Sequence, residues 1–175
     1  MFSDPQKNID QFHVDPGMKV VDLGSGAGFY SLTAARAVGE AGRVISVDVQ
    51  KDLLSKLKSE AQSNNLLNLD VVWGDIDEPN GSTLADGLAD RVLVTNTLFQ
   101  VENRENVIKE ARRILKPNGK FLVVDWSESF GGVGPQPADI ISSEDTKKIC
   151  LQNSFELDRE IEAGDHHYGL IFKAI

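Results

Sequence analysis

Short apolar runs alternate along this chain with longer stretches in which apolar residues recur at the 3.6-residue period of an α-helix. Such runs predict buried strands, and the stretches between them are long enough to form crossover helices. Strands joined by crossover helices lie parallel in one sheet, with helices covering its faces. The sequence therefore predicts an α/β fold. The expected strands are residues 18–23, 44–47, 69–73, 91–95 and 120–124.

The helical stretches carry start and stop signals. Ser142 is followed by an acidic pair and is suited to cap a helix, whereas Pro117 and Gly119 are expected to end one and form a turn. Residues 74–90 contain a Pro-Asn-Gly turn sequence and several Asp residues, so turns and loop are expected there, with at most one short helix. The expected helices are residues 29–38, a stretch that buries residues 53–61, residues 103–115, and a stretch from the Ser142 cap to residue 152.

The last two predicted strands determine how the sheet must end. Residues 155–161 and 168–174 both have strand patterns, and only residues 162–167 separate them. A parallel neighbour needs a crossover of about a dozen residues or more, so these two strands must be antiparallel. The dinucleotide-binding fold has only parallel strands, and an antiparallel final hairpin separates this chain from it.

Length, charge and cysteine content limit the function. The 175 residues are expected to form a single domain over 1–175, and 27 acidic against 18 basic residues leave a net charge of −9, which disfavours nucleic acid as a partner. A lone cysteine, Cys150, forms no internal disulfide, and the three histidines lack metal-ligand spacing, so no metal is expected. No apolar stretch is long enough to span a membrane, and a cytoplasmic location is expected. The sequence leaves open whether the chain forms a homodimer.

Glycines cluster where the first predicted strand meets the first predicted helix. Gly24, Gly26 and Gly28 leave the backbone free to approach a ligand, because no Cβ stands in the way. Nicotinamide dinucleotides are usually bound by the spacing G-x-G-x-x-G/A, which here would require Gly or Ala where the chain has Phe29. The sequence thus opposes a nicotinamide oxidoreductase, although a glycine loop alone can also be only a tight turn.

The spacing of Gly24, Gly26 and Gly28 after Asp22 resembles motif I of the class I S-adenosylmethionine (SAM)-dependent methyltransferases, and the antiparallel hairpin agrees with that family. The resemblance covers almost the whole chain. Residues 115–120 and 123–126 look like the branch that includes ubiquinone/menaquinone-biosynthesis and other small-molecule methyltransferases. The resemblance implies a Rossmann-like, doubly wound, seven-stranded sheet between two helical layers, with the strand order 3-2-1-4-5-7-6.

The resemblance also implies a set of cofactor-binding residues. The glycine loop would lie under the methionine and ribose of SAM, Asp22 near the amino group, and Asp48 would take both ribose hydroxyls, since one carboxylate offers two acceptors to a diol. The residues themselves leave open that Asp48 caps a helix and that Asp75 is a turn carboxylate. The implied residues are Asp22, Gly24, Ser25, Gly26, Gly28, Asp48, Val49 and Gln50 beside the adenine, Gly74, Asp75, Ile76, and the backbone of Asn96.

The acceptor is expected at the rim formed by residues 97–101, 125–127 and 164–168. His166 or His167 is the candidate general base, because imidazole takes up a proton near neutral pH; a solvated hairpin turn is the alternative. Trp126, Phe99 and Tyr30 are candidates for an apolar wall, or for the core. The segment before the first strand is expected to be too short for the N-terminal helices that often form a lid in this family, which leaves a second subunit or residues 127–137 to supply one.

These features predict an enzyme that transfers the sulfonium methyl group of SAM to an N, O, C or S nucleophile of an unidentified acceptor. A small-molecule acceptor is favoured. The alternatives are a methyltransferase acting on protein or RNA, and a cofactor-binding scaffold without turnover.

Overall fold

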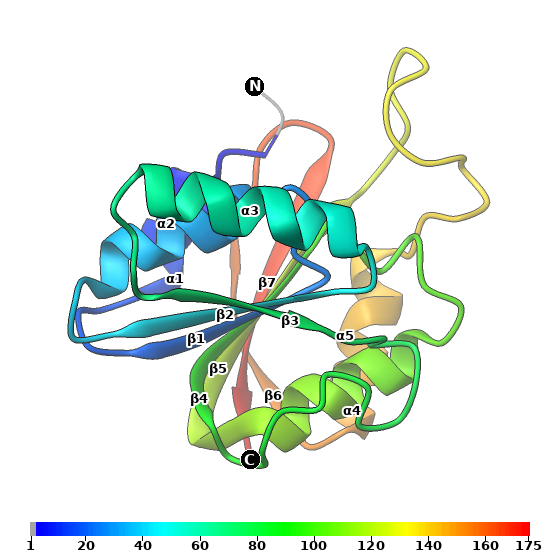
Figure 1. The fold of residues 1–175 in the computed structure, drawn as a ribbon. Helices are drawn as coiled ribbons and strands as arrows, with labels where there is room; N and C mark the ends of the chain where they lie inside the picture. The colour runs from blue at the N-terminus through cyan, green and yellow to red at the C-terminus, as the bar shows by residue number, and fades with distance from the viewer. Residues whose placement is uncertain (1–2) are drawn as a thin grey trace.

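A computed structural model describes residues 3–175 and places seven strands in one sheet in the order β3-β2-β1-β4-β5-β7-β6 (Figure 1). Strand β7 is antiparallel to both β5 and β6, and the other pairs are parallel. The predicted α/β class, strand order and antiparallel end are therefore confirmed. The strands are β1 Lys19–Leu23, β2 Arg43–Asp48, β3 Leu69–Trp73, β4 Ala89–Thr95, β5 Leu115–Trp126, β6 Phe155–Ile161 and β7 His167–Ala174. The helices are α1 Pro5–Phe12, α2 Phe29–Val38, α3 Lys51–Ser63, α4 Arg104–Ile114 and α5 Ser143–Gln152.

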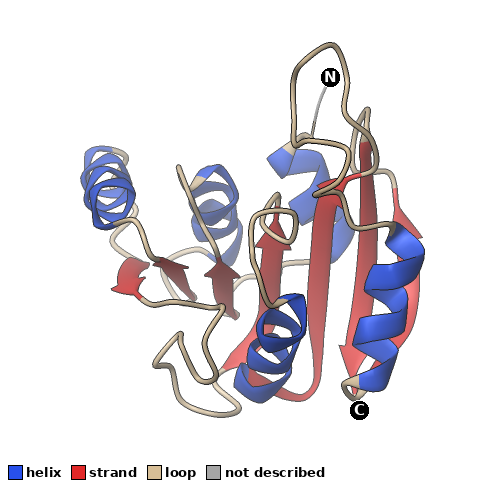
Figure 2. Cartoon of the chain, turned by 90° about the vertical axis from the view of Figure 1, so that its right-hand side faces the viewer, coloured by secondary structure: helices blue, strands red, loops and turns tan. Residues whose placement is uncertain are grey.

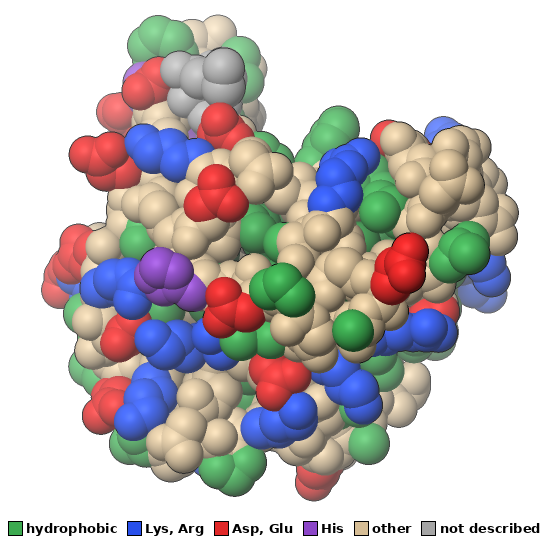
Figure 3. All heavy atoms as spheres, turned by 90° about the vertical axis from the view of Figure 1, so that its left-hand side faces the viewer, with side chains coloured by type: hydrophobic (Ala, Val, Ile, Leu, Met, Phe, Trp, Pro, Cys, Tyr) green, Lys and Arg blue, Asp and Glu red, His purple; other side chains and the backbone are tan. Residues whose placement is uncertain are grey.

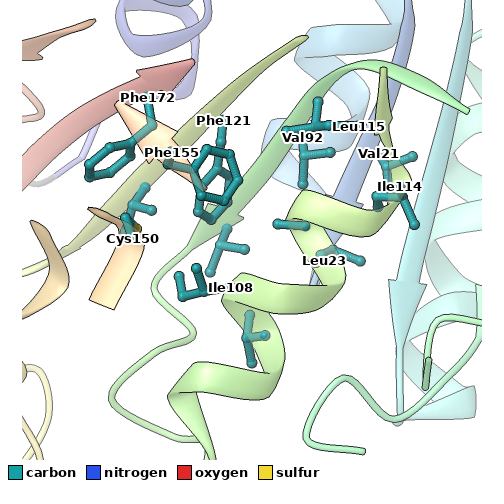
Figure 4. Close-up of a cluster of buried hydrophobic side chains, with 14 of the residues drawn as sticks. Val21, Leu23, Val92, Ile108, Ile114, Leu115, Phe121, Cys150, Phe155 and Phe172 are labelled. Atoms are coloured by element: carbon teal, nitrogen blue, oxygen red, sulfur yellow. The ribbon is translucent and has the colours of Figure 1, made fainter. Parts of the chain in front are cut away.

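Helices cover both faces of the sheet (Figure 2). Helices α1, α2 and α3 pack on one face, where the buried cluster includes Phe12 and Leu57. Helices α4 and α5 pack on the other face, over a cluster in which the rings of Phe121 and Phe155 stack at 5.2 Å (Figure 4). Cys150 of α5 is buried in this cluster, and burial raises the pKa of its thiol, as expected for a packing residue.

The segment before β1 forms one short helix, α1, which the sequence did not predict. Helix α1 begins with Pro5, and the carboxylate of Asp4 caps it by accepting the backbone N–H of Gln6 at 2.9 Å. Ile9 and Phe12 are buried in the apolar cluster between the sheet and helices α1 to α3. A helix of eight residues with only two buried apolar positions has a weak sequence pattern, and tertiary packing decides its existence.

Strand β5 begins directly after α4, where a turn was expected around Pro117 and Gly119. Ala89 of β4 pairs with Leu115, but Arg91 pairs with Lys120, so the register shifts across this stretch. Pro117 and Gly119 thus lie in the irregular first part of β5. The local sequence signal for a turn is the same in an irregular strand as in a loop, so it does not distinguish the two. Residues 74–88, in contrast, form turns as predicted.

The parallel strands point their carboxyl ends toward one edge of the sheet, which is where open α/β sheets bind ligands. Within residues 3–175, no helix combines the length and the apolar character needed to cross a membrane.

Candidate cofactor and active site

A cavity of about 420 Å³ opens at the carboxyl ends of strands β1 to β4. Its volume falls within the range of roughly 300–1,000 Å³ typical of small-molecule sites. All of the cofactor residues implied by the sequence line it except Asp22 and Gly28. The lining residues are Ser3, Pro5, Gly24, Ser25, Gly26, Ala27, Phe29, Tyr30, Asp48, Val49, Gln50, Gly74, Asp75, Ile76, Asp77, Thr95, Asn96, Thr97, Gln100 and Val101.

The glycine loop between β1 and α2 needs its glycines for different reasons. Gly24, Gly26 and Gly28 all have left-handed backbones, with φ of 76°, 52° and 81°. A Cβ on Gly26 would meet no atom within 4 Å, whereas one on Gly24 would lie 2.6 Å from Thr97 Cγ2. A Cβ on Gly28 would lie 2.2 Å from Leu57 Cδ1, so this glycine packs α2 against α3. Gly24 and Gly26 shape the cavity, and Gly28 supports it from behind.

Asp48 ties the end of β2 to the glycine loop. Its Oδ2 accepts the backbone N–H of Gly26 at 2.8 Å, and its Oδ1 accepts that of Gln50 at 2.8 Å. The cap residue of α3 is Gln50, so capping that helix is not the main role of Asp48. Each carboxylate oxygen keeps a second lone pair, and the residue lies on the cavity wall, which suits it to accept two hydroxyl groups of one ligand.

The ends of β2 and β3 add apolar and acidic groups to the wall. Val49 is exposed and Ile76 is mostly buried, and both line the cavity. Asp75 lines it as well, and its Oδ1 accepts the backbone N–H of Asp77 at 3.1 Å, so the turn role that the sequence left open is real. An apolar surface beside a carboxylate matches the needs of an aminopurine ring.

Two polar atoms of the cavity-lining residues are buried without a hydrogen-bond partner among the described residues: the Oγ of Ser25 and the Oδ1 of Asn96. Buried polar atoms are normally paired, so an unpartnered pair at a cavity indicates a polar ligand. Asn96 has a left-handed backbone with φ of 52°, and its N–H donates to the carbonyl of Val124 at 2.8 Å. The residues present therefore fit a ligand with several hydrogen-bonding groups.

Asp22 lies beneath the glycine loop and is fully buried. Its Oδ2 accepts a hydrogen bond from the Ser31 hydroxyl at 2.6 Å, and its Oδ1 has no partner among the described residues. Burial, with a smaller contribution from the charge of Asp48, raises the pKa of Asp22 to about 6, although the Ser31 hydrogen bond opposes the rise. Its contact with the cofactor amino group stays a prediction.

The histidines proposed as general bases do not line the cavity. Nδ1 of His166 lies 2.8 Å from Glu128 Oε1, and its ring stacks on Phe130 at 4.1 Å. His167 packs against Trp126 with ring centroids 4.3 Å apart, and burial lowers its pKa, which favours the neutral imidazole. The structure brings His167 together with the end of β5 and His166 with the segment after β5, and neither lines the cavity with the predicted cofactor residues.

Of the three aromatic residues proposed for an apolar wall, one lines the cavity. Tyr30 lines the cavity as proposed, but Phe99 and Trp126 do not. The Tyr30 hydroxyl accepts a hydrogen bond from Asn8 Nδ2 at 2.7 Å, which joins α2 to α1 and brings Ser3 to the cavity. A contact between segments so far apart has no local sequence signal.

The charged side chains of the lining are all acidic. Of residues 3–175, those that line the cavity include Asp48, Asp75 and Asp77 but no Lys, Arg or His. No group of three or more His, Cys, Asp or Glu side chains within the same range is arranged to hold a metal ion. The cavity thus favours a ligand that carries positive charge near these carboxylates.

Residues 14–168 match the profile of a family described as methyltransferase domain. The chain is 36% identical over 124 residues to the ubiquinone/menaquinone biosynthesis C-methyltransferase UbiE of Haemophilus ducreyi, covering 69% of this chain and 46% of that protein. It is 29% identical over 143 residues to an arsenite methyltransferase of Halobacterium salinarum, covering 82% of this chain and 35% of that protein. The chain therefore spans between about a third and a half of the length of these curated relatives.

Solved structures share the fold. A SAM-dependent methyltransferase from Aquifex aeolicus superposes with a TM-score of 0.89 at 25% identity, over 99% of this chain and 91% of that one. The cyclase SpnF superposes with a TM-score of 0.83 at 15% identity, over 97% of this chain and 79% of that one, which shows a common fold only. The glycine loop, the cavity and these matches agree with the resemblance seen in the sequence. The chain belongs to the class I SAM-dependent methyltransferase family.

Proposed function

We propose that this domain binds SAM in the cavity at the carboxyl ends of β1 to β4 and transfers its methyl group to a small neutral acceptor. Bound SAM supplies an activated methyl group on a sulfonium, which a nucleophile displaces to leave S-adenosylhomocysteine. The observation that carries the proposal is the convergence of Asp48 with the unpartnered oxygens of Ser25 and Asn96 around the glycine loop. This set offers hydrogen-bonding groups to a ribose and an amino-acid moiety.

The protein's contribution to transfer is mainly orientation. Holding a nucleophile and a methyl donor in line can supply roughly 7–11 kcal/mol of the barrier. Phe29 and Tyr30 at the start of α2, and Gln100 and Val101 after β4, line the same cavity as the cofactor residues and are suited to hold the acceptor. Burial raises the pKa of Tyr30, which keeps its phenol neutral, so it can position an acceptor but does not serve as a ready base at neutral pH.

The charge of the cavity supports a neutral acceptor. A carboxylate or phosphate acceptor would face the carboxylates of Asp48, Asp75 and Asp77, and the described lining residues include no lysine, arginine or histidine to offset them. The relatives are named for arsenite methylation and for a step of ubiquinone/menaquinone biosynthesis, which supports a small-molecule acceptor. RNA is disfavoured because the chain carries a net charge of −9 and basic residues are interspersed with acidic ones on the face in Figure 3. A reducing compartment such as the cytoplasm suits the single, buried Cys150.

Binding without turnover is the competing function, because sharing a fold does not by itself establish a reaction. The test has two stages. Calorimetric titration with SAM and S-adenosylhomocysteine, with NAD as a control, should give saturable binding of the first two only. Incubation with methyl-labelled SAM and either arsenite with a thiol or a reduced naphthoquinone should then yield labelled product. Binding without label transfer to either probe favours the scaffold, and absence of binding refutes the proposal.

A further inference from the structure

The segment between β4 and α4 forms one wall of the cavity. Asn96, Thr97, Gln100 and Val101 all line it. The Thr97 hydroxyl donates to the carbonyl of Gly24 at 3.2 Å, and its side chain fills the space that a Cβ on Gly24 would need. The position of this wall therefore also sets the packing of the glycine loop.

Charged side chains that do not line the cavity hold this wall at the backbone of Leu98. Asp125 Oδ2 accepts the N–H of Leu98 at 2.8 Å and that of Thr97 at 3.2 Å. Arg104 Nε donates to the carbonyl of Leu98 at 2.9 Å. The same backbone unit is thus fixed from its donor side and from its acceptor side.

Asp125 lies at the end of β5 and is only 1% exposed. Its Oδ1 accepts the N–H of Trp126 at 2.8 Å, so its partners are backbone N–H groups. Burial raises the pKa of Asp125 to about 6, and these hydrogen bonds and the charge of Arg104 oppose the rise. Tyr168 on β7 also interacts with Asp125, whose charge contributes to raising the pKa of that phenol. Hydrogen bonds to an ionised acceptor are roughly twice as strong as neutral ones, so at neutral pH this carboxylate holds the wall firmly.

Arg104 extends the connection to a second segment. Its Nη2 donates to the backbone carbonyl of Asp139 at 2.8 Å, in the segment between β5 and α5. A planar guanidinium can reach two carbonyls in fixed directions, which a lysine ammonium on a flexible stem does not reproduce. One side chain therefore links the cavity wall to the segment after β5.

We propose that Asp125 and Arg104 are positioning residues for cofactor binding: they clamp the backbone N–H and carbonyl of Leu98, and this clamp keeps the 96–101 wall in the shape that accepts SAM. This role rests on the proposed function, because SAM is the ligand whose affinity reports it. Neither residue needs to touch the cofactor or the acceptor.

The test combines ligand affinity with amide exchange in Asp125→Asn and Arg104→Lys. At pH 8 both variants should bind S-adenosylhomocysteine about tenfold more weakly than wild type, the effect expected when a buried donor or acceptor loses its partner. The amides of Thr97 and Leu98 should lose protection from hydrogen exchange in Asp125→Asn. Asp139→Asn is the matched control, since Arg104 contacts only its backbone carbonyl, and its affinity should equal that of wild type.

The pH profile separates positioning from a general structural defect. A protonated Asp125 resembles an asparagine, so the ratio of the dissociation constants of Asp125→Asn and wild type should be largest at pH 8 and shrink below about pH 6. Asp22, whose pKa is also raised to about 6, is present in both proteins and cancels from the ratio.

Unchanged affinity and amide protection in folded Asp125→Asn would overturn the clamp. If Asp125→Asn does not fold, the affinity of Arg104→Lys tests the clamp instead. The Arg104 side chain is partly exposed, and the substitution removes only its hydrogen bonds to backbone carbonyls. Wild-type protein that binds neither SAM nor S-adenosylhomocysteine would refute the proposed function, and the clamp with it. Normal wild-type binding with unaffected variants would refute the clamp alone.

Discussion

Replacing Asp48 with alanine tests the cofactor site most directly. The carboxylate accepts the backbone N–H groups of Gly26 and Gln50, each at 2.8 Å, and the residue is 7% exposed. Asp48→Ala leaves both donors without this acceptor, and each such loss costs about 1–3 kcal/mol when water cannot replace it. Because the cavity gives water access, we expect a loss of stability of about 1–2 kcal/mol, which leaves the protein folded.

The effect on ligand affinity should be larger. If Asp48 accepts two ribose hydroxyls, its removal deletes two charge-assisted hydrogen bonds, each contributing about 1.5 kcal/mol at the lower end of the usual range. The sum of about 3 kcal/mol corresponds to a roughly 100-fold weaker binding of S-adenosylhomocysteine. Asp48→Asn keeps one acceptor oxygen and should fall between wild type and Asp48→Ala.

Calorimetric titration at pH 8 measures these affinities, with thermal unfolding to verify folding. Asp52→Ala removes an exposed carboxylate from the first turn of α3 and controls for the change in net charge. Competition by adenosine and 2′-deoxyadenosine sharpens the test: wild type should prefer adenosine, and Asp48→Ala should lose that preference. A folded Asp48→Ala protein that binds within twofold of wild type would show that Asp48 is not a ribose ligand.

Three further predictions concern residues that do not line the cavity. The pKa of Asp22 is raised from 3.8 to about 6 in the folded protein, so its contribution to stability is present at low pH and is lost as the pH rises through 6. Relative to wild type, Asp22→Asn should gain up to about 3 kcal/mol of unfolding free energy between pH 4 and pH 7. Urea titration measures this gain, and a difference that does not depend on pH would contradict the prediction. Replacing both His166 and His167 with Gln should lower turnover more than affinity for SAM if either is the base, and equal turnover would remove both from that role. Gly28→Ala should destabilise the fold by about 1–3 kcal/mol, because the φ of Gly28 is 81° and the new Cβ would press on Leu57. A free energy of unfolding within about 0.5 kcal/mol of wild type, the size of change seen for neutral surface substitutions, would refute this prediction.

The convergence of the candidate cofactor residues on one edge of the sheet could be predicted from the sequence because its signals are local. Gly24 and Gly26 lie at a strand–helix junction, and Asp48 and Asp75 follow the ends of consecutive strands. Parallel strands bring such ends to one edge of a sheet, so their meeting follows from the fold class alone. The structure places all of these residues on one cavity, as the family resemblance implied.

The acceptor side could not be predicted in the same way. The rim was expected to include His166, yet that side chain contacts Glu128 and Phe130 instead of the cavity. The turn between β6 and β7 does lie near the segment after β5, but which way its side chains point depends on packing between segments more than thirty residues apart. A residue type in the right loop is a weaker signal than a motif at a fixed spacing.

By itself, the sequence determined the α/β class and the antiparallel end of the sheet, because six residues between two strands cannot form a crossover. It also determined the glycine loop, whose conformation depends on residues next to one another. Only the tertiary structure decided that Asn8 of α1 donates a hydrogen bond to Tyr30 on the cavity wall and that Asp22 is buried. It also decided that Asp125 and Arg104 both form hydrogen bonds with the backbone of Leu98. These features arise from contacts between distant segments, and their energies depend on burial and hydrogen-bond geometry, which exist only once the chain has folded.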